Sequence, residues 1–131
     1  MPGETDLQKL LKNMRPELRD GEYVFCTFPD GNAPRFDLDP LGCFRETEGW
    51  TLILERSVAE QAGVSYGFVA RLITLTIHSS LEAVGFLDVI TQKLAAAGIS
   101  TNVISAYYHD HLFVPVDKTE QALQLLLEMT T

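Results

Sequence analysis

The sequence is poor in positive charge. Its 131 residues include 10 Lys and Arg against 18 Asp and Glu, which gives a formal net charge of −8. No run of basic residues interrupts this acidic character. An acidic chain repels nucleic-acid phosphates and anionic lipid headgroups. We therefore expect neither nucleic acid nor a membrane among its partners.

Cysteines are few and long hydrophobic runs are absent. The richest apolar stretch, residues 68–77, is interrupted by Arg71, Thr74 and Thr76, so it does not suit a membrane span. Residues 1–6 are acidic and lack the apolar centre of a secretory signal. Cys26 and Cys43 form no disulfide framework and are expected to be reduced thiols. By elimination, these features predict a cytoplasmic protein.

The composition is that of a folded chain, with 46% hydrophobic residues. A chain of this length can bury a core without disulfides or metals, as one compact body or as two very small domains that share a core. In the first half, apolar spacing predicts a helix over residues 7–14, with Thr5 or Asp6 as its N-cap. The expected elements that follow are a strand over 22–28, a loop over 31–42, a hairpin over 43–55 and a short helix over 57–62.

The second half has the pattern strand, helix, strand, strand, helix. A strand over residues 68–78 leads to Ser79-Ser80-Leu81-Glu82, which fits a helix-starting capping box. The predicted helix continues to Ala97, and Gly98 ends it. Strands over 99–106 and 111–116 follow, with a turn at His109-Asp110 and a last helix capped by Asp117.

Such a unit normally closes with a fourth strand after its second helix. Here only two residues follow that helix, so either the strand is absent or a strand from the first half replaces it. We expect the replacement, because an uncovered sheet edge invites unwanted pairing. The fold expected is α+β, with antiparallel sheets covered by helices on one face and two units intertwined in one body.

Three segments resemble ACT domains. They are LTIHSSLEAVGFL (residues 75–87), LAAAGISTNVISA (residues 94–106) and, less closely, GWTLILE (residues 49–55). Residues 102–115 look like the small bacterial proteins of uncharacterised function with two ACT domains. Those proteins are similar to the regulatory ACT pairs of aspartate kinase and to the CASTOR proteins. The resemblance divides the chain into an N-terminal ACT-like unit, 1–65, and a C-terminal ACT domain, 66–131.

The resemblance implies a tandem ferredoxin-like βαββαβ fold and a non-enzymatic regulatory module. Such a module binds a small amino-acid-like effector where two ACT units meet, and it forms a homodimer. A helix N-terminus suits the effector's carboxylate, and the carbonyl groups of a strand edge suit its amino group. Carried onto this sequence, the binding residues are those of the first strand–helix loop and of the facing strand: His78, Ser79, Ser80, Leu81, Val84, Gly85, Asn102, Val103 and Ile104.

Several residues allow a second interpretation. His109 and His111, with help from His78, could grip a metal, but ordinary turn chemistry explains Asp110 between them, and we assign no metal site. Capping explains Ser79 and Ser80 without a nucleophile, so we assign no catalytic residue and no cofactor. Gly85, expected inside a helix, would allow either close packing or room for a ligand.

Two functions therefore remain open at the level of sequence. One is the effector-binding regulatory module. The other is a self-associating interaction scaffold that binds no ligand.

Overall fold

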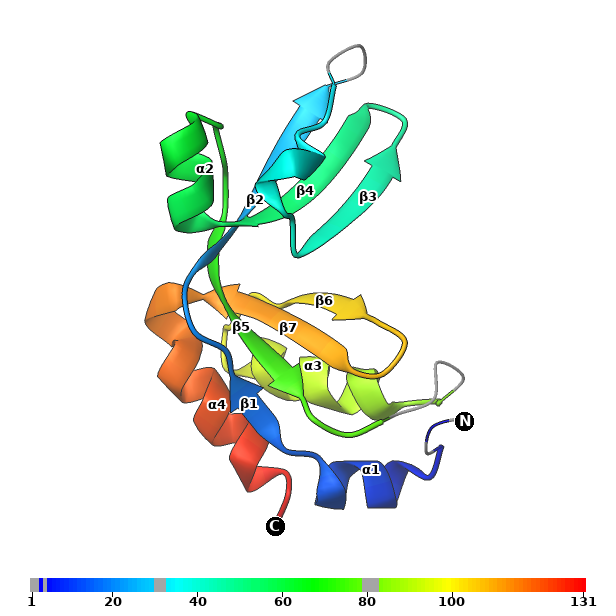
Figure 1. Cartoon of the computed structure of the whole chain (residues 1–131). Helices are drawn as coiled ribbons and strands as arrows, with labels where there is room; N and C mark the ends of the chain where they lie inside the picture. Colours follow the sequence, from blue (N-terminus) through cyan, green and yellow to red (C-terminus); the bar gives the residue numbers. More distant parts are fainter. Residues whose placement is uncertain (1–2, 4, 30–32, 79–82) are drawn as a thin grey trace. The chain divides into compact units, whose positions relative to one another are not determined.

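The computed structural model describes residues 3, 5–29, 33–78 and 83–131 (Figure 1). Its contacts group into two compact units, and one of them is built from two separate stretches of chain. We call residues 1–20 with 71–131 the two-segment unit, and residues 21–70 the central unit. Both combine helices with antiparallel strands, which gives tandem ferredoxin-like units of the α+β class.

The two-segment unit completes its sheet with a strand from the N-terminus. The strand order is β1-β5-β7-β6, and β1 pairs antiparallel with β5 so that Glu17 lies opposite Thr74. This is the order of a βαββαβ sheet in which β1 stands in for the strand that would follow α4. The expectation that the first half supplies the missing strand is confirmed. The elements are α1 (Leu7–Asn13), β1 (Pro16–Leu18), β5 (Val69–Leu75), α3 (Phe86–Ala96), β6 (Asn102–Ser105), β7 (Asp110–Pro115), the 3-10 helix η2 (Val116–Lys118) and α4 (Thr119–Glu128).

One continuous core joins the helices of this unit to one face of its sheet. The helices α3 and α4 pack on that face, and the N-terminal segment adds two fully buried residues, Leu10 in α1 and the C-cap residue Met14. The other buried members are Ile73, Leu75, Phe86, Ile90, Leu94, Ile99, Leu112, Val114, Ala122 and Leu126. Strand β1 contributes Leu18 at the margin of the same cluster.

Helix ends follow the predicted signals in two places. The Asp6 carboxylate accepts hydrogen bonds from the backbone N–H groups of Gln8 (3.0 Å) and Lys9 (3.2 Å), so Asp6 is the N-cap of α1. Gly98 lies just beyond α3 with φ +76°, a left-handed conformation that glycine adopts without strain.

Two predicted helix starts are wrong. Helix α3 begins at Phe86, because Ala83 and Val84 are not helical and Gly85 turns the chain with φ +89°. The predicted start at residues 79–82 lies outside the described residues. Helix α4 begins at Thr119 without a side-chain cap, because Asp117 is taken up in η2.

The central unit has the strand order β3-β4-β2-β5, again with antiparallel pairing. Where a ferredoxin-like unit carries its first helix, the described residues form only the short 3-10 helix η1. Its small core consists of Val24, Cys26, Leu52, Leu54 and Ala59. The elements are β2 (Tyr23–Pro29), η1 (Phe36–Leu38), β3 (Gly42–Glu46), β4 (Gly49–Glu55), α2 (Arg56–Ala62) and the first residues of β5.

Strand β5 takes part in both units. Val69 and Ala70 pair with β2 in the central unit, and residues 73–75 pair with β1 in the two-segment unit. Within the part of the chain that the structure describes, none of the helices has the length and apolarity that crossing a membrane requires.

Candidate functional site

The predicted site lies around the start of α3. Gly85 occupies the N-cap position, and among the described residues no side chain caps this end of the 11-residue helix. The first-turn N–H groups of any α-helix lack intrahelical acceptors and carry a partial positive charge. Of the described atoms, a Cβ added at Gly85 would meet only Leu7 Cδ2, at 3.7 Å, so the positive φ and not crowding by these atoms requires glycine here. The expectation that Gly85 lies inside a helix is wrong.

Of the predicted loop residues, three are described. His78 follows β5 and is partly buried, and Val84 is 85% exposed immediately before Gly85. Ser79, Ser80 and Leu81 lie outside the described residues. The described part of the loop therefore offers an imidazole on one side and an exposed, uncapped helix start on the other.

An aromatic cluster that sequence reasoning missed adjoins His78. The ring centroid of His78 lies 5.1 Å from that of Tyr108 and 6.2 Å from that of Tyr107, and the centroids of the two tyrosine rings are 4.9 Å apart. Both tyrosines are about 60% exposed, at 62% and 60%. The cluster forms because β5 and β6 run in the same direction and end at the end of the sheet where α3 begins (Figure 1).

The turn between β6 and β7 was predicted two residues too late. The Ala106 N–H donates to the His109 carbonyl at 3.0 Å, which places Tyr107 and Tyr108 at the tip of the turn. Asp110 consequently begins β7 and is buried, with only 6% of its surface exposed. Two adjacent tyrosines, Tyr107 and Tyr108, directly before the predicted turn were the sequence feature that could have indicated this cluster.

Strand β6 is the edge strand of the two-segment unit. Most of it is formed by the predicted facing-strand residues Asn102, Val103 and Ile104. Val103 packs against the core, whereas Asn102 and Ile104 are exposed. Because β6 runs toward the end at which α3 begins, Asn102 lies at the far end of the strand (Figure 1). The fold of one copy thus places the end of β5 and the start of α3 at one end of the sheet, and Asn102 at the other.

The histidines of β7 and its turn have other surroundings. His111 Nδ1 lies 3.0 Å from Thr74 Oγ1, and burial, followed by the nearby His109, lowers the pKa of His111 below 6.5. The rings of His109 and His111 lie 6.3 Å apart between centroids. Within the described ranges, no three His, Cys, Asp or Glu side chains group as a metal site would require.

Comparison with known proteins decides the family. Residues 2–71 match an ACT domain, and residues 68–128 match a second one. The chain belongs to the ACT domain family. The two matches cover nearly all of its length and meet in β5. Comparison with curated proteins gives no match.

Solved structures agree with this tandem ACT assignment. The chain is 50% identical to a Vibrio cholerae protein of unknown function described as a "possible transport protein", and the two structures match with a TM-score of 0.85. The match covers 95% of this chain and 96% of that one. It shares its fold with the regulatory subunit of aspartate kinase from Thermus flavus, at 8% identity, a TM-score of 0.60 and full coverage of both chains. The aspartokinase alpha and beta subunits give 12% identity and a TM-score of 0.61, covering 87% of this chain and 95% of that one.

Proposed function

We propose that this ACT pair binds a small amino-acid-like effector where ACT units of two copies meet, and that it acts through the change in packing that follows. Membership in the ACT family supports a regulatory rather than a catalytic role. The division into ACT units 1–65 and 66–131, the homodimer and a cytoplasmic location belong to the same proposal.

The observation that carries the proposal is the start of α3 at Gly85, where none of the described side chains forms a cap. Backbone N–H groups there, in the partial positive charge of the helix end, suit the carboxylate of an amino acid. The left-handed Gly85 has no Cβ, so a ligand can approach the backbone closely. The His78–Tyr107–Tyr108 cluster, at the end of the sheet where α3 begins, would supply aromatic surface for the ligand's side chain.

The edge of β6 supplies the second half of the proposed site. Carbonyl groups along Asn102, Val103 and Ile104 would accept hydrogen bonds from the ligand's amino group. Because Asn102 lies apart from Gly85 within one copy, the β6 edge would come from the partner. The ligand would then stabilise the dimer to the extent that it binds paired copies more tightly than separate copies.

A ligand-free scaffold is the second candidate. Val84, Tyr107 and Tyr108 expose apolar surface at one end of the two-segment unit, which suits self-association as well as it suits a ligand.

Thermal shift measurements with each of the twenty amino acids, read together with light scattering, separate the two candidates. An effector at a hundred times its Kd should stabilise the fold by about 2.7 kcal/mol and raise Tm visibly. Gly85→Ala should abolish that response, while Gly67→Ala, which has open space around its Cβ position, should keep it. If no amino acid raises Tm and the chain is dimeric throughout, the scaffold is correct and the effector proposal fails.

A further inference from the structure

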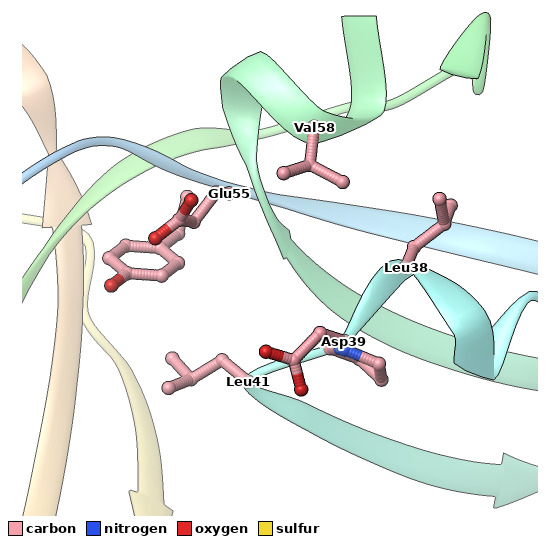
Figure 2. Close-up of a pocket in the computed structure, with 7 residues that line it drawn as sticks. Leu38, Asp39, Leu41, Glu55 and Val58 are labelled. Carbon is pink, nitrogen blue, oxygen red and sulfur yellow. The ribbon is translucent and has the colours of Figure 1, made fainter. Parts of the chain in front are cut away.

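A hollow lies wholly in the central unit and shares no residue with the site assigned above. It has a volume of about 330 Å³ and is bounded by the end of η1, the residues that follow it, the end of β4 and the start of α2 (Figure 2). That volume falls at the lower end of the range seen for small-ligand sites. It therefore suits a compact molecule of a few heavy atoms.

The wall combines polar groups, which make up the larger part of its surface, with several apolar side chains. Leu38, Leu41 and Val58 face the hollow from three different elements or loops, and the buried Tyr23 closes it from β2. Leu41 directly precedes β3 and lines the hollow, and 52% of its surface is exposed. An aliphatic chain placed there would cover this side chain and remove apolar surface from water.

Two carboxylates complete the lining, Asp39 and Glu55. Figure 2 shows them around the same hollow as Leu38, Leu41 and Val58. Asp39 has φ +54°, the left-handed conformation that Asp and Asn tolerate better than most residues. This conformation ends η1 and directs the chain back toward β3.

In the part of the chain that the structure describes, neither carboxylate pairs with a protein cation, whereas their acidic neighbours do. Arg35 pairs with Asp37 at 3.0 Å, and Arg56 pairs with Glu22 at 2.8 Å and with Glu60 at 3.4 Å. Among the described residues no side-chain hydrogen bond or ion pair involves the carboxylate of Asp39 or that of Glu55. Arg35 and Arg56 are thus already engaged, and Asp39 and Glu55 leave two acidic groups on the lining of the hollow.

We propose that this hollow binds a small aliphatic organic cation, an alkyl ammonium or guanidinium group. The cationic head would lie between Asp39 and Glu55, and the alkyl chain would lie on Leu38, Leu41 and Val58. A charge-assisted hydrogen bond from the head to a carboxylate is stronger than one between neutral groups. This proposal does not depend on the effector site at α3, because the two sites share no residue.

The test is a backbone-amide NMR titration of the whole chain with n-butylamine, which is charged at neutral pH, and with its neutral analogue 1-butanol. Butylammonium should give saturable shifts confined to residues 38–41 and 55–58. Its Kd should rise at least tenfold in Asp39→Asn and in Glu55→Gln, and it should rise with added salt. Glu48→Gln removes an exposed carboxylate that does not line the hollow, so this control should leave the Kd unchanged.

Asn tolerates the left-handed conformation of residue 39, so Asp39→Asn should preserve the fold, and the dispersion of its amide spectrum will check this. Equal binding of 1-butanol would overturn the proposal, because charge would then play no part. The absence of any saturable shift at millimolar concentration would overturn it as well, as would an unchanged Kd in both carboxamide variants.

Discussion

The N-terminal segment should be indispensable for the two-segment unit, although the second ACT match begins only at residue 68. The perturbation is a fragment of residues 66–131, which retains β5, α3, β6, β7 and α4 but lacks α1 and β1. In the whole chain, β1 lies along the second half of β5. The backbone bonds that hold it include Thr76 N–H to the Arg15 carbonyl (2.8 Å) and Arg19 N–H to the Leu72 carbonyl (2.9 Å).

The expected loss can be worked from burial. Leu10 and Met14 are both fully buried in the core of this unit, and each contributes about 1.5–3 kcal/mol when removed from water. Their loss alone costs about 3–6 kcal/mol, which approaches the whole stability of a small domain. The unpaired edge of β5 and the lost packing of Leu7, Leu11 and Leu18 add to this. We therefore expect the fragment to lack a cooperative unfolding transition.

The assay is urea and thermal denaturation followed by circular dichroism, on the fragment, on the whole chain and on a rescue variant. The rescue appends residues 5–20 after Thr131 through a Gly/Ser linker of ten residues, which spans about 17 Å on average. Leu11 and Lys12 border the same hollow as Met129 and Thr131, so α1 and the C-terminus are near neighbours. Cooperative folding should return in the rescue variant. A bare fragment that unfolds with a Tm close to that of the whole chain would refute the reasoning.

Three further predictions concern single residues. Leu94→Ala leaves a cavity at a fully buried position in the same core and should lower the free energy of unfolding by about 2–5 kcal/mol. The neighbouring exposed control Lys93→Ala should change it little, and equal effects of the two variants in urea titrations would contradict this. Gly85→Ala forces a side chain into φ +89° and should cost about 1–2 kcal/mol, against about 0.5 kcal/mol or less for Gly67→Ala, both measured by denaturation. The pKa of His111 is lowered in the folded chain, so the unfolded chain binds the proton more readily. The contribution of His111 to the free energy of unfolding should therefore be fully present above pH 6.5 and should be lost as the pH falls through the pKa of the folded state. His111→Asn should flatten that slope between pH 8 and pH 5, and a slope that survives in the variant would assign it to another group.

Local rules predicted much of the fold. The Asp6 cap of α1 and the glycine stop at Gly98 follow from hydrogen-bonding groups within a few residues, and both were foreseen. The replacement strand was foreseen from the need to cover a sheet edge, and β1 confirms it. Such features depend on neighbours in sequence or on a rule of sheet closure.

What was missed depends on competition between two acceptable local patterns. Asp117 suits an N-cap, but the chain leaving Pro115 forms η2 first, and α4 starts two residues later. His109-Asp110 suits a turn, but Asp110 is buried as the first residue of β7, and the turn moves to Ala106–His109. The aromatic cluster at His78 could not be predicted from spacing, because it joins the ends of two strands that are not neighbours in the sheet.

The shared strand β5 has a consequence for synthesis. The first twenty residues leave the ribosome long before their pairing partner, so β1 must wait while the intervening stretch is made. During that interval the apolar side chains of Leu10 and Met14 have no core to enter. Translation past residue 75 supplies the partner for β1, but the core that receives α1 also needs α3, β7 and α4, so this unit should fold only once nearly the whole chain has emerged.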